Sequence, residues 1–236
     1  MNMLSNLKLG ANLITQYFDF SEIDLEKMQK ATVQTLGMTA GSVIIVFLFG
    51  LLLGLLLYET NGKETPGAKV LYSVVAFFVN VFRSVPFIIL IVLIMPFTKT
   101  LVGSIIGPLA ALPALIISSA PFYGRLVEIG FREIDKGVIE AAEAMGASKW
   151  DIIYKVLIPE SLPAIVSGLT VTTISLVGYT AMAGVIGAGG LGNLAYLDGF
   201  QRNQPAVTLV ATLIILVLVF TIQFVGDTAV KRIDKR

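Results

Sequence analysis

Residues 31–58 read ATVQTLGMTAGSVIIVFLFGLLLGLLLY, a stretch without one charged side chain. An α-helix rises about 1.5 Å per residue, so about twenty mostly apolar residues are enough to cross the hydrocarbon core of a bilayer. Leucine fills nearly every position from Leu51 to Leu57, where a soluble helix would show a polar face. The stretch predicts a membrane-spanning helix, and it decides the fold class of the chain.

The composition of the whole chain agrees with a membrane protein. Charged residues make up 14% of the 236 positions and hydrophobic residues 56%, with a mean hydropathy of +0.85. Soluble domains carry about a quarter charged residues, because their surface needs them. We therefore expect membrane lipid to cover part of the surface.

Two residue types that carry much of protein chemistry are missing, since the chain has no cysteine and no histidine. Disulfides, metal sites built from Cys or His, and nucleophiles activated by histidine are excluded. The net charge of +1 gives no electrostatic reason to bind nucleic acid. No catalytic residue and no metal site is predicted.

The middle of the chain contains two further predicted spans. We expect the second span to have its core at Ser84–Phe97, preceded by an interfacial helix at Val70–Phe82. One kinked helix through both segments is the alternative. The third span runs from about Leu101 to Tyr123, and its three prolines predict either a broken helix or simple kinks.

Two more spans complete an all-α, polytopic fold of about five transmembrane helices. Ser161–Leu197 is uncharged but too long for one crossing, so the fourth span fills its first two-thirds. A glycine cluster at 184–192 then predicts a turn into a short surface segment. The fifth span is about Pro205–Val225.

The N-terminal thirty residues are mixed and polar. We interpret residues 1–30 as an extension and residues 31–236 as the transmembrane domain. The tetrapeptide at 21–24, Ser-Glu-Ile-Asp, has the pattern of a capping box and predicts a helix start. Acidic residues occupy the positions where a signal peptide would need its apolar core, so no cleaved signal is expected.

Lysine and arginine are unevenly divided between the two faces that five spans create. With a cytoplasmic C-terminus, twelve of the seventeen Lys and Arg residues lie on the cytoplasmic side. The positive-inside rule therefore predicts a multi-pass protein of the plasma (inner) membrane with its N-terminus outside and its C-terminus in the cytoplasm. Residues 1–30 would then be extracytoplasmic.

The predicted spans contain no ionisable side chain except Arg83 at a boundary, which is either a snorkelling residue or a functional charge near the inner mouth. Ion-coupled transporters place such groups at membrane depth. If the chain moves a solute uphill, the energy must therefore enter through a partner. An ATP-independent channel or scaffold subunit also fits this absence, whereas a membrane-embedded enzyme would need reactive groups that the spans lack.

The segment 125–160 is the longest charged stretch, and its capping residues and glycine predict where helices begin and end. Asp135 is placed to cap a helix over Lys136–Met145, and Gly146 is placed to end it in the left-handed conformation. Ser148 is placed to cap a second short helix. We expect two short helices around a glycine bend, between the third and fourth spans, as a docking element.

Two details support the second short helix. Asp151 follows Ser148 by three residues and completes a capping box. Pro159 is expected to end the helix, because proline has no backbone N–H to donate.

The same segment resembles the EAA loop of binding-protein-dependent ABC importer permeases. That pattern reads E-A-A, three residues, G, nine residues, I-x-L-P, and the chain has Glu140-Ala141-Ala142, Gly146 and Val156-Leu157-Ile158-Pro159 at this spacing. Valine and isoleucine replace the family's Ile and Leu. With RSVPFII at 83–89 and VIGAGGLG at 185–192, the chain resembles the methionine-type permease over roughly residues 31–236.

The resemblance implies a type I ABC importer permease fold and the permease subunit of an ATP-driven importer for a small amino acid, methionine first. A permease for another solute, such as a polar amino acid or glycine betaine, is the alternative. It further implies a permease homodimer, two cytoplasmic ABC ATPase subunits and an extracytoplasmic substrate-binding protein. ATP and Mg would bind the ATPase, so no cofactor is expected in this chain.

The resemblance also assigns a set of residues to ATPase coupling. These are Glu140, Ala141, Ala142, Gly146, Ala147, Ser148, Lys149, Trp150, Asp151 and Pro159.

A second set of residues lies on one face of the predicted fourth span, at alternating intervals of four and three. The set is Gly168, Thr172, Ser175, Tyr179 and Met182. We interpret this stripe as the lining of a translocation path, with ordinary helix–helix contact as the alternative, because small and hydroxyl residues also pack membrane helices. Two G-x-x-x-G pairs in the first span, Gly37/Gly41 and Gly50/Gly54, predict close helix approach.

Overall fold

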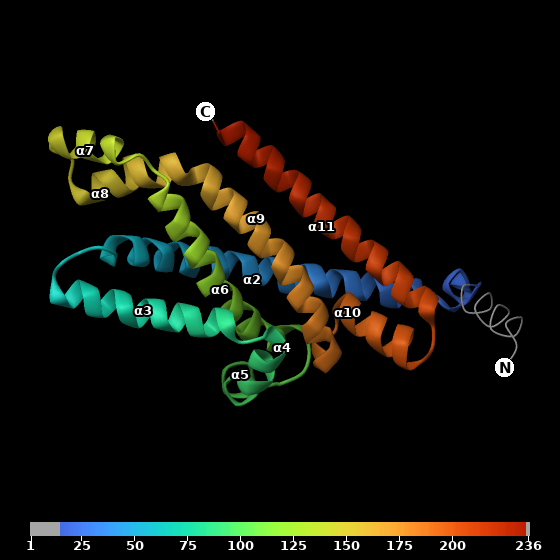
Figure 1. Ribbon diagram of the computed structural model, residues 1–236. Helices are drawn as coiled ribbons and strands as arrows, with labels where there is room; N and C mark the ends of the chain where they lie inside the picture. Colours follow the sequence, from blue (N-terminus) through green and yellow to red (C-terminus); the bar gives the residue numbers. More distant parts are fainter. Residues whose placement is uncertain (1–14, 235–236) are drawn as a thin grey trace, which may run out of the picture. The chain divides into compact units, whose positions relative to one another are not determined.

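The computed structural model describes residues 15–234, and helices joined by short connections make up this part of the chain (Figure 1). The helices are α2 (Leu25–Thr60), α3 (Pro66–Ser84), α4 (Phe87–Leu93), α5 (Met95–Val102), α6 (Pro108–Arg132), α7 (Lys136–Ala144), α8 (Lys149–Ile152), α9 (Ile158–Ala183), α10 (Gly190–Leu194) and α11 (Pro205–Ile233). Residues 1–14, which belong to the predicted N-terminal extension, lie outside the described part.

Five segments within residues 15–234 are long and apolar enough to cross a membrane, which confirms the predicted number of spans. They are α2, α3, α6, the continuous helical segment Lys149–Ala188 and α11. The chain divides into two compact units. Of the described residues, the first contains 15–41, Phe87–Leu115 and Val177–Phe220, and the second contains Ser42–Pro86, Ile116–Leu176 and 221–234.

Helix α2 begins at Leu25, six residues ahead of the predicted span. Its N-terminal cap is Asp24, whose carboxylate accepts a hydrogen bond from the backbone N–H of Lys27 at 3.0 Å. Ser21 instead lies in a short 3-10 turn, Phe20–Glu22, capped by Asp19. The prediction that Ser21 caps the first helix is therefore wrong, because the chain makes a tight turn before the helix starts.

The prediction for the second span is wrong. The spanning helix is α3, which contains Val70–Phe82, while Ser84–Phe97 is divided between the end of α3 and two short helices. Pro66 occupies the first turn of α3, where its missing N–H costs nothing. Val85, which precedes Pro86, is extended and ends the helix. The two prolines set the ends, and Arg83 in the last turn does not interrupt the helix.

The third span is displaced toward the C-terminus relative to its prediction, because α6 covers Pro108–Arg132. Leu101 belongs to α5, which ends at Gly103 in the left-handed conformation. Pro108 is the first residue of α6, and the helix continues through Pro113 and Pro121. The predicted break of this span is therefore not observed in the described structure.

The chain does not leave the helical conformation at Pro159, contrary to the prediction. A π-helical turn, Ile153–Leu157, joins α8 to α9, and Pro159 is the second residue of α9. The backbone N–H of Ile158 donates to the carbonyl of Ile153, five residues earlier. This wider turn lies directly ahead of the proline and gives its ring room, so the coupling segment continues into the fourth span.

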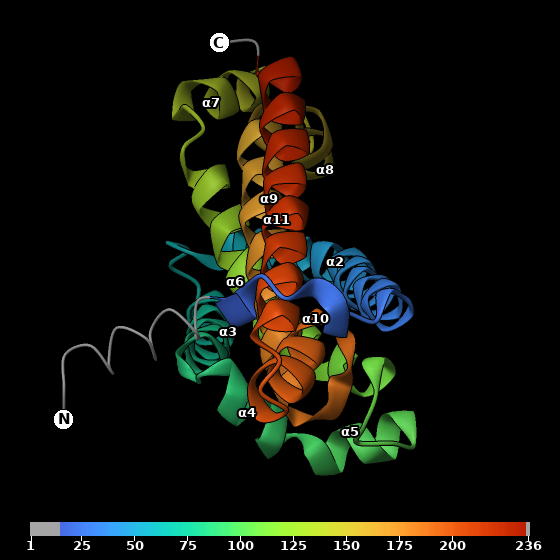
Figure 2. The same ribbon diagram turned by 90° about the vertical axis from the view of Figure 1, so that its right-hand side faces the viewer.

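Close helix contacts at glycine organise the second unit. A Cβ atom at Gly54 would lie 2.6 Å from Cβ of Val127, and one at Gly226 would lie 2.2 Å from Oγ1 of Thr170. The first contact joins α2 to α6, and the second joins α11 to α9, over which α11 lies in Figure 2. The pair Gly50/Gly54 thus packs within the chain, as one of the predicted G-x-x-x-G pairs was expected to do.

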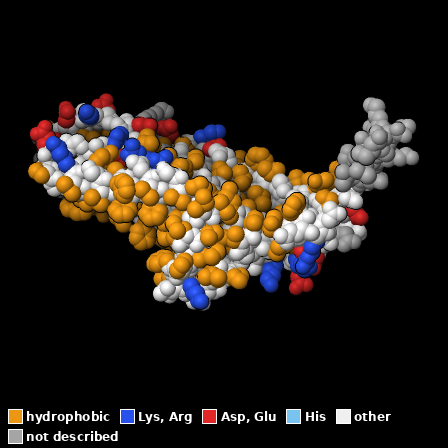
Figure 3. Space-filling model, turned by 60° about the horizontal axis from the view of Figure 1, so that its bottom comes forward, with side chains coloured by type: hydrophobic (Ala, Val, Ile, Leu, Met, Phe, Trp, Pro, Cys, Tyr) orange, Lys and Arg blue, Asp and Glu red, His pale blue; other side chains and the backbone are white. Residues whose placement is uncertain are grey.

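Apolar side chains cover much of the surface, as lipid exposure requires. On α3, Val70 and Phe77 are 63% and 62% exposed, and on α11, Phe220 and Phe224 are 68% and 72% exposed. Figure 3 shows hydrophobic side chains over a broad face, while charged side chains gather at the end where α7 lies. Such an apolar surface would be unfavourable in water.

Candidate coupling loop and translocation path

The predicted helix caps and glycine bend between α6 and α9 are present in the structure. The carboxylate of Asp135 accepts a hydrogen bond from the N–H of Gly137 at 2.7 Å, and α7 starts at Lys136. Gly146 follows α7 with φ of +79°, a conformation that disfavours any residue with a Cβ. The hydroxyl of Ser148 then accepts from the N–H of Asp151 at 3.2 Å and caps α8.

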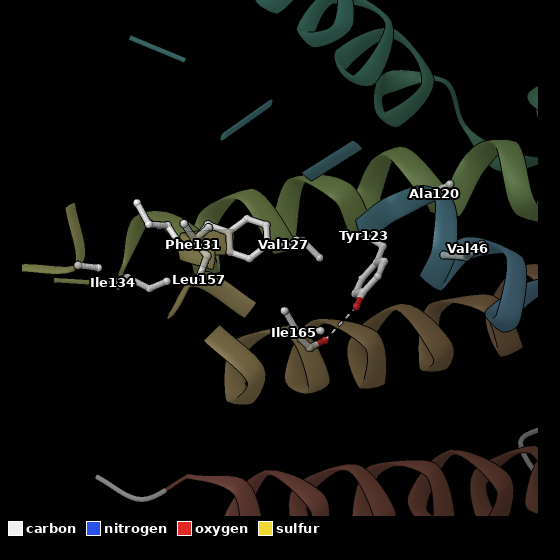
Figure 4. Packing of buried hydrophobic residues seen from close by; sticks show 10 residues of the cluster. Val46, Ala120, Tyr123, Val127, Phe131, Ile134, Leu157 and Ile165 are labelled. Carbon is white, nitrogen blue, oxygen red and sulfur yellow. Dashed lines mark hydrogen bonds between the residues drawn. The ribbon is translucent and has the colours of Figure 1, made fainter. Parts of the chain in front are cut away.

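The loop is anchored in the hydrophobic core of the second unit. Ala142 of α7, Ile152 of α8 and Leu157 of the π-helical turn are buried in one cluster with Phe131 and Ile134. Figure 4 shows Phe131, Ile134 and Leu157 lying together, and the hydroxyl of Tyr123 donating to the carbonyl of Ile165. The second alanine of the EAA pattern is therefore a core residue, and the loop has a defined position relative to α6 and α9.

The other side of the loop is exposed. Glu140, Ala141, Lys149 and Pro159 are exposed, whereas Ala147 and Asp151 are half-buried. The predicted coupling residues thus fall into three groups. One is buried in the core, one forms the helix caps and the glycine bend, and one forms the outward-facing surface.

Aromatic side chains dominate the outward surface. Trp150 is 67% exposed and stacks on Tyr154, which is 66% exposed, with a ring-centroid distance of 6.2 Å. Met145, beside the glycine bend, is 83% exposed. Aromatic residues and methionine are enriched in protein interfaces, and exposed apolar groups outside the membrane are unfavourable without a partner. Tyr154 and Met145 were missed by sequence analysis, although the i, i+4 spacing of Trp150 and Tyr154 was a signal.

A buried charge network stands where the loop begins, and sequence analysis missed it as well. The Glu128 side chain of α6 is completely buried, and its two carboxylate oxygens accept from Arg125 and from Arg132, one helical turn away on each side. A buried carboxylate is strongly unfavourable unless it is paired. The spacing of three and four residues was visible in the sequence, but burial was not.

The residues of the predicted path stripe all lie on α9, with different exposure. Gly168 and Thr172 are buried, Ser175 and Tyr179 are half-buried, and Met182 is 46% exposed. The hydroxyls of the two polar residues donate to the carbonyls of their own helix, four residues earlier. Both hydroxyls are therefore satisfied without a ligand. These contacts are compatible with a lining of the translocation path and equally with simple helix packing.

Tyr179 has a partner within the first unit. Its ring stacks on that of Phe87 from α4, with centroids 4.7 Å apart and planes inclined by 9°. Phe87 belongs to the RSVPF tract that contributed to the family resemblance. The tract and the stripe are thus brought together by the fold.

The glycine cluster interrupts the fourth span as predicted, and the segment that follows is partly buried, with Val185 and Leu197 exposed at 41% and 37%. Gly184, Ala188, Gly190 and Leu191 are buried. The N–H of Gly190 donates to the side-chain oxygen of Gln34 at 2.8 Å, and the N–H of Leu191 donates to the hydroxyl of Thr35 at 2.9 Å. Irregular backbone at membrane depth needs such partners.

These two polar residues of α2 are functional candidates that sequence analysis missed, because it treated the first span only as an apolar run. Gln34 and Thr35 stand in the part of α2 that belongs to the first unit. The available signal was a glutamine inside the uncharged run 31–58, where it is the only amide side chain. Among residues 15–234, no group of three or more His, Cys, Asp or Glu residues could hold a metal ion.

The described fold and site define a class: a helical, multi-pass membrane protein with a loop between its third and fourth spans that is anchored in the hydrophobic core. Comparison with family models makes the class specific. Residues 50–236 match the model of the binding-protein-dependent transport system inner membrane component. The chain belongs to this family.

Individual relatives agree with the family assignment. The chain is 58% identical over 217 residues to the methionine import system permease protein MetP of Bacillus subtilis. The matched region covers 92% of this chain and 98% of MetP. It is 41% identical over 228 residues to the probable D-methionine transport system permease protein MetI of Vibrio cholerae, which covers 97% of this chain and 100% of that protein.

A solved structure matches the fold. It is described as inward-facing conformations of the MetNI methionine ABC transporter, and the matched chain is 43% identical in sequence with a TM-score of 0.86. The match covers 91% of this chain and 100% of that one. The all-α fold of an ABC importer permease is therefore confirmed.

Proposed function

We propose that this chain is the permease subunit of an ATP-driven importer of methionine. The observation that carries the proposal is the docking loop, with its left-handed Gly146 between two capped helices and its exposed Trp150 and Tyr154. Family membership gives the transporter class, and the two methionine permeases that the chain resembles over nearly their full length supply the substrate.

ATP hydrolysis belongs in this proposal to a separate partner, and ATP and Mg bind there. Two cytoplasmic ABC ATPase subunits each receive one loop, with the stacked Trp150 and Tyr154 as the apolar anchor and Glu140 and Lys149 as polar contacts at the rim. Because Ala142, Ile152 and Leu157 fix the loop to the core, a movement of the ATPase is transmitted to α6 and α9.

Two copies of the chain form a homodimer around the solute path, since five spans do not readily enclose one. An extracytoplasmic substrate-binding protein delivers the solute. The stripe from Gly168 to Met182 lines the path, with Tyr179 and Met182 as a gate, and alternating access moves the solute. Methionine suits a soft and adaptable partner such as Met182.

For orientation we propose an extracytoplasmic N-terminus, including residues 1–30 as an extension, and a cytoplasmic C-terminus. Because α3 is the second span, Arg83 and Lys63 lie at opposite ends of it, so Arg83 no longer counts as cytoplasmic. The number of cytoplasmic Lys and Arg residues falls from twelve to eleven of seventeen. The excess still favours this orientation. In the second unit, the C-terminal end of α11 lies toward the same end as α7 (Figure 2), which supports a common side.

Uptake of radiolabelled methionine by a strain lacking its own methionine importers tests the proposal. The chain, expressed with a neighbouring ATPase and binding protein, is expected to restore ATP-dependent uptake. Unlabelled glycine betaine and polar amino acids serve as competitors. Competition by these solutes but not by methionine would assign the permease to another substrate, and ATP-independent flux would indicate a channel.

A further inference from the structure

A basic pocket in the second unit lies outside the docking surface and the solute path. It is an open pocket of about 370 Å³. Its lining residues come from the end of α2, the following loop, the end of α6 and the start of α7, and they are Tyr58, Glu59, Asn61, Lys63, Arg132 and Lys136. Segments that are far apart in sequence thus bring three cations to one pocket.

The charge of the pocket favours an anion. Lys63 pairs with Glu59 at 2.8 Å, and Arg132 pairs with Glu128 from the buried side. With both carboxylates counted, three cations face two anions, and Glu128 is itself shared with Arg125 outside the pocket. At least one positive charge is left for a ligand. Guanidinium and ammonium groups around one space suit a phosphate, which accepts several hydrogen bonds.

The position of the pocket, at the end of a membrane-spanning helix, favours a lipid as its ligand. Tyr58 and Glu59 belong to the last turn of α2, where a long apolar helix gives way to polar residues. Tyrosine is typical of this interface, where lipid headgroups lie. The Tyr58 ring also packs on Phe131 with a centroid distance of 5.6 Å, so the pocket is built on the core. Helix α3, which starts just beyond Lys63, presents exposed Val70 and Val74 on its surface, where acyl chains would run.

We propose that this pocket binds the phosphate headgroup of an anionic phospholipid. Lys63 contacts the phosphate from the loop after α2, Lys136 from the first turn of α7, and Arg132 from the end of α6. Basic pockets between membrane helices bind such headgroups in general. Since Lys136 is the first residue of α7, the bound lipid joins the end of α2 to the start of the docking loop. This goes beyond the proposed transport function and does not depend on the transported solute.

Native mass spectrometry of the purified full-length protein tests the proposal. Phosphatidylglycerol and phosphatidylcholine with identical acyl chains are titrated separately, and inorganic phosphate is added as a competitor. We expect tighter binding of phosphatidylglycerol, and we expect K63Q/K136Q to weaken it about tenfold. Both lysines are exposed, so the fold should survive, and an unchanged melting temperature checks this.

Two further variants separate the pocket from general charge. Lys231→Gln removes a positive charge at the end of α11, outside the pocket, and should leave phosphatidylglycerol binding unchanged. Lys136→Arg keeps the charge and should retain binding. Equal binding of the two lipids, or an effect of Lys231→Gln as large as that of K63Q/K136Q, would overturn the proposal. Displacement of the lipid by dilute inorganic phosphate would identify a free anion as the ligand and would also overturn it.

Discussion

At the scale of single residues, Glu128 is the one charged side chain that is buried among the described residues 15–234. Replacing it by glutamine keeps its shape and removes the charge that holds Arg125 and Arg132. The two guanidinium groups are partly exposed and can find water, so we expect the free energy of unfolding to fall by about 2 kcal/mol. Thermal unfolding in detergent measures this. Glu133→Gln, at an exposed position five residues later, should change the melting temperature little.

The glycine segment offers a second prediction at this scale. Gly190 has φ of +81°, and a Cβ there would lie 2.7 Å from Oγ1 of Thr35. Gly190→Ala should therefore destabilise the protein by about 1–2 kcal/mol from the backbone alone, with more from the contact. Gly178→Ala is the matched control, because Gly178 is helical and its Cβ would meet nothing within 4 Å. A melting temperature lowered equally by both would contradict the account.

At the scale of elements, the bend between α7 and α8 is the feature on which the proposed coupling depends. Gly146→Ala and Gly62→Ala place a Cβ at similar positive φ values, +79° and +74°, with nothing within 4 Å in either case. Each should cost about 1 kcal/mol. Only Gly146 lies in the loop that we propose as the docking element, so only Gly146→Ala should lower ATP-dependent uptake severalfold in proteoliposomes. Equal uptake losses in the two variants would argue against the docking role.

The face of α9 that we assign to the path makes the next prediction. Ser175→Trp should block uptake while ATP hydrolysis by the partner continues, because a bulky ring obstructs a narrow path. Val177, on the opposite face, is 2% exposed, so a larger side chain there would disturb the core and could not serve as a control. Val171 is exposed, but it lies one turn before Ser175 on the same face, so Val225 of α11, which is 60% exposed and outside the stripe, is the better control. Loss of uptake in both Ser175→Trp and Val225→Trp would contradict the assignment.

At the scale of the whole molecule, the proposed orientation can be tested directly, because the chain has no cysteine of its own. Gln201→Cys lies ahead of α11, and Glu64→Cys lies between α2 and α3; both positions are exposed. An impermeant thiol reagent applied to intact cells should label the first variant, and it should label the second only after lysis. The reverse pattern would place the N-terminus in the cytoplasm.

The sequence by itself determined the class of the protein, the number of spans and the position of the capped loop between the third and fourth spans. Long apolar runs leave a chain no alternative to lipid-exposed helices, because every backbone group must be bonded within the membrane. Caps act over three or four residues, so Asp135, Gly146 and Ser148 could be assigned locally. The family resemblance rested on this same local pattern.

Only the tertiary structure decided which side chains those helices bury. The second span could not be located by hydropathy, since two apolar runs competed and Pro66 and Pro86 settled the ends of α3. Burial of Ala142 and Glu128, and the bonds from Gly190 and Leu191 to α2, depend on contacts between segments distant in sequence. Local propensity carries no information about such partners, because a buried polar group is satisfied by whichever helix the fold brings beside it.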